Sequence, residues 1–148
     1  MIDRAIATPA GSAAAAWQAL TEVTAWPTWT TSVIAVVPLD EETNPHPRLG
    51  RRYEVRQPGM RPLVWKVTEI HEGKSFTWQT TMPGLTLVGR HWVDIHPDGT
   101  TAVANSIEHR GPLARVVRAL TGRRTRRYLE LEIAGLAQAS RSAGTDPA

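Results

Sequence analysis

Hydrophobic and polar side chains alternate in a series of short runs between residues 51 and 111. A period of two is typical of strands that bury one face, and turn residues such as the PDGT segment at 97–100 separate the runs. In the first run, Tyr53, Val55 and Gln57 share one face, and charged residues occupy the other. This part of the chain is therefore predicted to form a meandering antiparallel sheet.

Two further strands are expected nearer the start of the chain, at about residues 2–8 and 32–40, where short apolar runs end at a proline. The alanine-rich stretch between them predicts a helix that begins after Ser12, a good N-capping residue, and runs to about residue 23. A strand and a helix are therefore expected to precede the main series of strands.

The segment VTAWPTWT at 23–30 places two of the six tryptophans on either side of a proline. Thr24 can cap a short helix that Pro27 opens, because proline is tolerated in the first turn. Trp26 and Trp29 are then three residues apart, close to one face of that helix. We expect this segment to be a plug that closes one end of the fold.

A long helix is predicted after Pro112, and it reaches to about residue 141. Its apolar stripe changes position midway. The first stripe consists of Leu113, Val116, Val117 and Leu120, and the second of Leu129, Ile133, Leu136 and Ala137. These two stripes do not align on an unbroken helix, so a kink or break is expected at Gly122, which lies between them.

The predicted order of elements is a strand, two short helices, about six antiparallel strands and a long C-terminal helix. This is an α+β chain with a sheet of about seven strands, forming one domain at 1–141 with a flexible tail at 142–148. The apolar face of the sheet must be covered, and the C-terminal helix is the element large enough to cover it. A strongly twisted sheet of this size curves, so we expect a pocket where sheet and helix do not meet.

Several stretches resemble the START-like superfamily, also called SRPBCC, helix-grip or Bet v 1-like, and within it the polyketide cyclase/dehydrase and lipid-transport family. The stretches are TPAGSAAAAWQALTEVTAWPTW (8–29), RRYEVRQPG (51–59), VWKVTEIHEGKSFTW (64–78), VGRHWVDIHPDGTT (88–101), HRGPLARVV (109–117) and RRYLELEIAGL (126–136). The resemblance implies the helix-grip fold, in which a curved sheet wraps around the long helix. It also implies a hydrophobic small-molecule ligand, and it assigns no catalytic residue.

Composition narrows the function classes. The 148 residues are 41% hydrophobic and 21% charged, as in an ordinary folded domain. Without cysteine the chain cannot form disulfides or thiolate metal sites. No apolar run approaches the roughly 20 residues of a membrane helix, and the N-terminus lacks the apolar core of a signal peptide. A cytoplasmic protein without stable membrane insertion is therefore expected.

Positive charge gathers near the C-terminus, where residues 112–141 hold seven arginines and two glutamates, against a net charge of +3 for the whole chain. Such a segment can bind RNA, a ribosome or an anionic membrane surface. The RRTRR run at 123–127, however, wraps around the helix, and no aromatic residue is interleaved with it for base stacking. Nucleic acid is therefore not an expected partner.

His91 is the main candidate for chemistry among the polar residues that the alternation turns inward. It lies between Gly89, which would let a ligand or the helix approach closely, and Val93. An imidazole there can orient a ligand carbonyl or act as acid/base in an aldol-type cyclisation. It can equally be a core histidine bonded to a neighbouring strand or to Tyr128. His109, near the end of its strand, is expected at the rim or in solvent.

The predicted ligand-binding residues share inward faces or the expected ends of the pocket. They are Trp26, Trp29, Val55, Gln57, Trp65, Trp78, Thr80, Met82, Gly89, His91, Asn105 and Tyr128. Asn105 can instead hydrogen-bond a buried neighbour. No metal or cofactor site is predicted, because His91 and His96 face opposite sides of a strand and no glycine-rich phosphate-binding motif is present.

Three functions stay open at this point. The first is binding of a polyketide, lipid or aromatic metabolite in an internal cavity, by a monomer or a homodimer. The second is a polyketide cyclase/dehydratase-type enzyme that uses His91 as acid/base. The third is an interaction module that binds RNA, a ribosome or a membrane through its basic C-terminal helix.

Overall fold

The computed structural model describes residues 1–144, and within them seven strands form one antiparallel sheet. The strands are β1 (Ile2–Ala7), β2 (Ala35–Pro38), β3 (Arg52–Arg56), β4 (Leu63–His71), β5 (Ser75–Met82), β6 (Leu85–Ile95) and β7 (Thr101–Arg110). Their order is β1-β7-β6-β5-β4-β3-β2, so the strands from β2 to β7 form the predicted meander. The first strand, β1, forms one edge of the sheet and pairs with the last strand, β7, from Ile2 opposite Glu108 to Ala7 opposite Val103.

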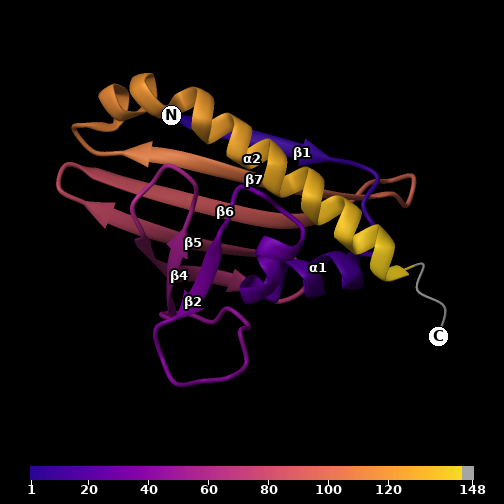
Figure 1. Cartoon of the computed structure of the whole chain (residues 1–148). Helices are drawn as coiled ribbons and strands as arrows, with labels where there is room; N and C mark the ends of the chain where they lie inside the picture. Colours follow the sequence, from indigo (N-terminus) through magenta and orange to yellow (C-terminus); the bar gives the residue numbers. More distant parts are fainter. Residues whose placement is uncertain (145–148) are drawn as a thin grey trace.

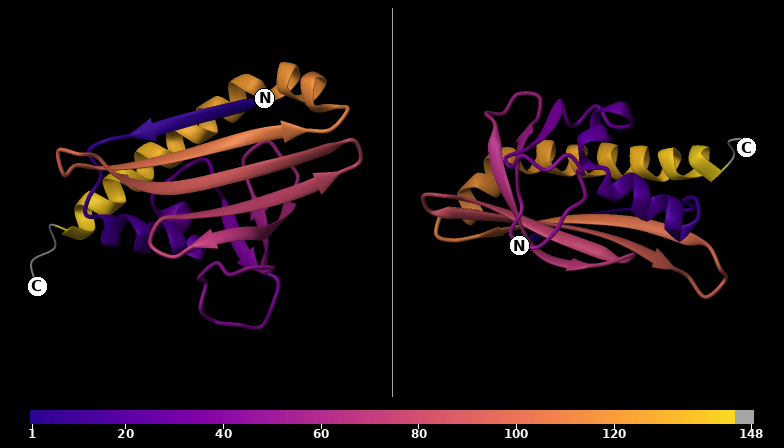
Figure 2. Two further views of the ribbon diagram at one scale, coloured as in Figure 1. Left: turned by 180° about the vertical axis from the view of Figure 1, so that it is seen from behind. Right: turned by 90° about the horizontal axis from the view of Figure 1, so that it is seen from below.

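Three helical segments accompany the sheet: α1 (Ala13–Thr21), the 3-10 helix η1 (Val23–Thr28) and α2 (Ala114–Gly144). The long helix α2 crosses one face of the twisted sheet, where it contacts β1 and β7, and α1 packs beside it (Figures 1 and 2). The predicted α+β helix-grip fold is confirmed. No helix within residues 1–144 is both long and apolar enough to cross a membrane.

The plug segment differs from its prediction in detail. Ser12 caps α1 as expected, accepting a hydrogen bond from the Ala15 amide at 3.1 Å. Thr24 caps nothing, because η1 starts at Val23 directly after α1 and has no side-chain cap. Pro27 lies near the end of η1 and not in its first turn. The tight 3-10 winding buries Trp26, whose indole Nε1 donates to the Leu20 carbonyl at the end of α1 (2.9 Å).

A kink or break is predicted at Gly122; α2 runs through this residue without interruption, so no break occurs. Its first turns bend away from the axis of the remainder in Figure 2. The second apolar stripe is buried, but most of the first stripe faces solvent, with Val116 57% and Leu120 81% exposed. Because the two stripes do not align on a continuous helix, only one of them can face the sheet.

The C-terminal half of α2 packs tightly against the N-terminal helices. A Cβ atom at Gly135 would lie 2.0 Å from the Trp29 carbonyl oxygen, and one at Gly11 would lie 2.1 Å from the Ser140 carbonyl oxygen. The predicted tail begins at residue 142, but α2 continues to Gly144; residues 145–148 lie outside the described residues. The residues that α2 contributes to the hydrophobic core, Ile133, Leu136 and Ala137, all lie in this half of the helix.

Candidate functional site

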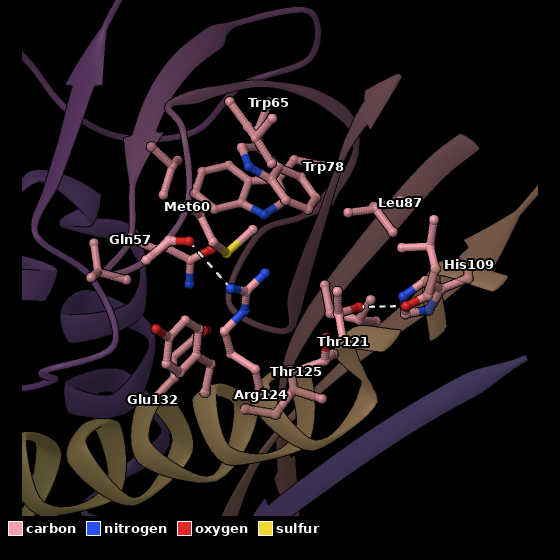
Figure 3. A pocket seen from close by; sticks show the side chains of 18 of the residues that line it. Gln57, Met60, Trp65, Trp78, Leu87, His109, Thr121, Arg124, Thr125 and Glu132 are labelled. Atoms are coloured by element: carbon pink, nitrogen blue, oxygen red, sulfur yellow. Dashed lines mark hydrogen bonds between the residues drawn. The ribbon is translucent and has the colours of Figure 1, made fainter. Parts of the chain in front are cut away.

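A cavity of about 420 Å³ lies between the first half of α2 and the sheet. Its wall is mainly apolar and aromatic. The aromatic part comes from Trp26, Trp65, Trp78 and Tyr128. In Figure 3 the indoles of Trp65 and Trp78 lie on the sheet side, opposite Arg124 and Glu132, which extend from α2. The C-terminal half of α2 touches η1, whereas the first half lines the cavity with Val117, Thr121 and Thr125 and is held to β1 by the ion pair of Arg118 with Asp3.

Eight of the predicted site residues line this cavity: Trp26, Val55, Gln57, Trp65, Trp78, Met82, His91 and Tyr128. They come from η1, β3, β4, β5, β6 and α2 and from the residue after β3. Strand alternation accounts for most of them, because residues of one parity share the face that α2 covers. The remaining four, Trp29, Thr80, Gly89 and Asn105, do not line it.

Gly89 serves a different purpose from the predicted one. It pairs with Trp78 across β5 and β6, and a Cβ atom at this position would lie 3.1 Å from the Trp78 indole. The missing side chain makes room for that ring, not for a ligand or the helix. Trp29 packs against Trp26 with ring centroids 5.7 Å apart, outside the cavity.

Asn105 takes the alternative role of a buried hydrogen-bonding residue. It is fully buried, and its Nδ2 donates to the Leu129 carbonyl oxygen of α2 at 3.1 Å. A buried amide that binds the helix backbone ties β7 to α2 beneath the cavity. Thr80 is also buried, 4% exposed, but away from the cavity wall.

His91 lies at the buried end of the cavity, within a group of aromatic rings. Phe76 stacks on the imidazole with centroids 4.6 Å apart, and Trp26 and Trp78 lie at 5.3 and 5.6 Å. The Nε2 atom of His91 is 3.1 Å from Glu132 Oε1 of α2. Both residues are more than nine-tenths buried. A carboxyl group from the helix and an imidazole from the sheet thus lie side by side at this end of the cavity.

Three polar atoms at this end have no hydrogen-bond partner among the described residues: His91 Nδ1, Glu132 Oε1 and Asn105 Oδ1. Leaving a buried polar atom unpaired costs free energy, about 1–3 kcal/mol each. The unmet hydrogen-bonding capacity marks this end as the polar part of an otherwise apolar cavity.

His109 contradicts its prediction, because it is 4% exposed and lines the cavity. The cause is β1, which covers this end of β7: the His109 amide donates to the Met1 carbonyl at 3.0 Å. Burial lowers the pKa of His109 below its ordinary value, and nearby Asp3 acts in the opposite direction. The neutral imidazole is therefore the favoured form here.

The turn between β3 and β4 is tied to α2 at the exposed end of the cavity. Arg124 donates to the Gly59 carbonyl at 3.2 Å, drawn as a dashed line in Figure 3, and the Tyr128 hydroxyl donates to the Pro58 carbonyl. Met60 in the same turn lines the cavity. The cavity is therefore bounded by buried His91 at one end and by this turn at the other.

Glu132 and Arg124 are site residues that the sequence interpretation missed. A signal for Glu132 exists in the helical period, since it lies three residues after Leu129 and four before Leu136 in the buried stripe. A carboxylate on that face is unusual enough to indicate a site. Arg124 gives no such signal, because it belongs to a run of arginines that surrounds the helix.

Solved structures share this fold at low sequence identity. The hypothetical protein jhp0584 from Helicobacter pylori matches with a TM-score of 0.78 and 13% identity, over 95% of this chain and 86% of that one. Truncated norcoclaurine synthase from Thalictrum flavum matches with 0.67 and 14%, over 100% and 95%. Ara h 8.0201 matches with 0.60 and 12%, over 97% and 96%.

No curated protein matches the chain in sequence. The family model for polyketide cyclase/dehydrase and lipid transport, in contrast, matches residues 4–141. This match spans β2 to β7, most of β1 and nearly all of α2. The chain therefore belongs to the polyketide cyclase/dehydrase and lipid-transport family.

Proposed function

We propose that this protein binds a hydrophobic small molecule, such as a polyketide, a lipid or an aromatic metabolite, in the cavity between α2 and the sheet. The observation that carries the proposal is the cavity of about 420 Å³ with aromatic walls. Ligand cavities commonly measure about 300–1,000 Å³ and are mainly apolar with a few polar groups. Membership of a family described by lipid transport and polyketide chemistry supports the same class of ligand.

Affinity would come from removing apolar ligand surface from water, at about 25 cal/mol per Å² before the costs of ordering. Trp26, Trp65 and Trp78 offer large, rigid surfaces for this purpose. Met60 and Met82 are unbranched and adaptable, so they can adjust the wall to ligands of different shape.

Binding of an uncharged fluorescent dye, N-phenyl-1-naphthylamine, tests this function. Leu87→Trp fills the cavity from β6 and should lower dye affinity by about tenfold or more, because the added ring occupies the ligand space. Ile95→Trp is the matched control, since Ile95 lies on the same strand and is 61% exposed. Equal dye binding by the two variants would contradict cavity binding.

A second candidate function is that of a cyclase or dehydratase, and the contact between His91 and Glu132 favours it. An imidazole and a carboxylate can move protons in an apolar site from which water is largely excluded. This function predicts that His91→Ala abolishes turnover of a true substrate and leaves dye binding mostly intact. Full activity of that variant would remove His91 from the acid/base role.

The interaction hypothesis concerns the solvent face of the same helix. Exposed Val116 and Leu120 lie there beside exposed arginines such as Arg115 and Arg123. Binding through phosphate groups weakens steeply as salt is added, whereas binding of an uncharged molecule in the cavity does not. A salt titration therefore separates this hypothesis from the proposed function.

A further inference from the structure

We propose that the buried end of the cavity recognises a hydroxyl group on an otherwise apolar aromatic ligand, through the carboxylate of Glu132 beside His91. The inference rests on the proposed function, because it names the class of molecule that the cavity accepts. In this arrangement the hydroxyl group of the ligand hydrogen-bonds to Glu132, and its aromatic rings pack against the tryptophan-lined wall.

The first argument is the unmet hydrogen-bonding capacity of Glu132. This residue is 8% exposed and lines the cavity. Its Oε1 lies 3.1 Å from His91 Nε2, but the contact lacks hydrogen-bond geometry and leaves Oε1 without a donor. A carboxylate has about four acceptor positions, and Oε1 receives no hydrogen bond within residues 1–144. A bound molecule with an O–H or N–H donor would satisfy it.

The second argument is which part of Glu132 a ligand can reach. Oε1 is enclosed on the His91 side, and the side chain as a whole keeps 11% of its surface exposed. Since Glu132 lines the cavity, a ligand held there can reach its carboxylate. A ligand donor can therefore hydrogen-bond to Glu132 without displacing His91.

The third argument is that the group of the ligand at this end of the cavity is neutral, neither anionic nor cationic. An anionic group at this end would meet the carboxylate directly, and like charges repel strongly where water is scarce. A cationic ligand would pass Arg61 and Arg124, which line the exposed end of the cavity. A neutral donor avoids both penalties. Among neutral donors, a hydroxyl on an aromatic ring suits a wall that contains Trp26 and Trp78.

The strength of the preference follows from the charge of the acceptor. Hydrogen bonds to ionised groups are about twice as strong as neutral ones. A site built around such a bond discriminates against an analogue that lacks the hydroxyl, because the buried polar group is then left unpaired. We expect an aromatic alcohol to bind about tenfold or more tightly than its parent hydrocarbon.

The test compares 2-naphthol with naphthalene as competitors of the bound dye. The wild-type protein should prefer 2-naphthol by about tenfold or more. Glu132→Leu should remove this preference, and Glu132→Gln, which keeps the shape of the side chain, should reduce it. Glu130→Gln is the matched control, because Glu130 lies on the same helix, is exposed and carries the same charge. Thermal unfolding of each variant identifies any loss of fold.

Equal binding of 2-naphthol and naphthalene by the wild type would overturn hydroxyl recognition and leave cavity binding intact. Retention of the preference by Glu132→Leu would likewise overturn the assignment to Glu132. Tighter binding of naphthylmethylammonium than of 2-naphthol would show that the site prefers a cation, which also contradicts the proposal. Failure of the dye and of both naphthalenes to bind would overturn this inference together with the proposed function.

Discussion

The backbone of α2 at Gly135 touches the carbonyl oxygen of Trp29, so closely that a Cβ atom would lie 2.0 Å from that oxygen. This contact holds η1 against the C-terminal half of the helix. The first half faces the cavity through Val117, Thr121 and Thr125. The position of one small residue thus helps to decide which part of the helix packs and which part bounds a hollow.

Gly135→Ala should destabilise the fold by about 2–3 kcal/mol, because the new methyl group collides with backbone that cannot move away cheaply. The gain in helix propensity, about 1 kcal/mol, is smaller than this penalty. Urea unfolding followed by circular dichroism measures the difference in free energy.

Gly122→Ala is the matched control on the same helix. There the new Cβ atom meets the far end of the flexible Arg126 side chain, with its closest atom at 3.2 Å. This variant should be stabilised by about 0.5–1 kcal/mol. A similar change in stability for the two variants would contradict the close packing of η1 on Gly135.

The contact between His91 and Glu132 should appear as a coupling in stability. His91→Leu removes the imidazole whose Nε2 lies 3.1 Å from the buried carboxyl group and should cost about 1–3 kcal/mol. Adding Glu132→Leu should recover part of that loss, because both polar groups are then gone. A double-mutant cycle by urea unfolding measures the coupling, expected at about 1 kcal/mol. Strictly additive effects would show that the two side chains do not interact.

Much of the fold could be predicted from the sequence, because alternation along strands and the helical period report on which face is buried. Val55, Gln57 and Trp78 were placed on the cavity side by parity alone, and they do line it. The position of a residue along a strand shows which face of the sheet it lies on, but it does not show which residue of the next strand it contacts. Alternation therefore could not show that Gly89 makes room for Trp78. It also could not show that Asn105 binds the backbone of α2.

The errors arise where distant segments meet. His109 was expected at the rim because the pairing of β1 with β7 cannot be deduced from either strand alone. The two misaligned stripes of α2 predict a kink or break at Gly122, but the helix is continuous, and Leu120 is 81% exposed because the second stripe determines which face meets the sheet. Glu132 was overlooked although its spacing places it on that second stripe.

The ion pair between Asp3 of β1 and Arg118 of α2 predicts a pH dependence of stability. Arg118 donates to both carboxylate oxygens, at 3.1 and 2.9 Å, and this lowers the pKa of Asp3 below its ordinary value of 3.8. A lowered pKa means that the stabilisation is complete above the unfolded value and is lost as pH falls through the folded one. At neutral pH, Asp3→Asn should therefore cost about 1–2 kcal/mol.

The difference between wild type and Asp3→Asn should shrink below about pH 4, where the Asp3 carboxylate takes up a proton. Urea unfolding at several pH values measures it. Asp94→Asn serves as the control, since Asp94 is exposed and its removal should change stability little at any of these pH values. If the difference in stability between wild type and Asp3→Asn stayed constant down to strongly acidic pH, this result would contradict the role of the ion pair.

Ligand exchange should depend on the turn between β3 and β4, which the Tyr128 hydroxyl ties to α2 through the Pro58 carbonyl. Tyr128→Phe removes one hydrogen bond, worth about 0.5–1.5 kcal/mol, and so favours opening of this end of the cavity. Dye association and dissociation, followed by stopped-flow fluorescence, should both become about 2–10-fold faster, with a smaller change in affinity.

Tyr53→Phe is a close control, because the Tyr53 hydroxyl also donates to a proline carbonyl, that of Pro45 at 2.9 Å, and Tyr53 does not line the cavity. If both variants exchanged dye at the wild-type rate, the turn would not control entry, and ligands would reach the buried end by another path.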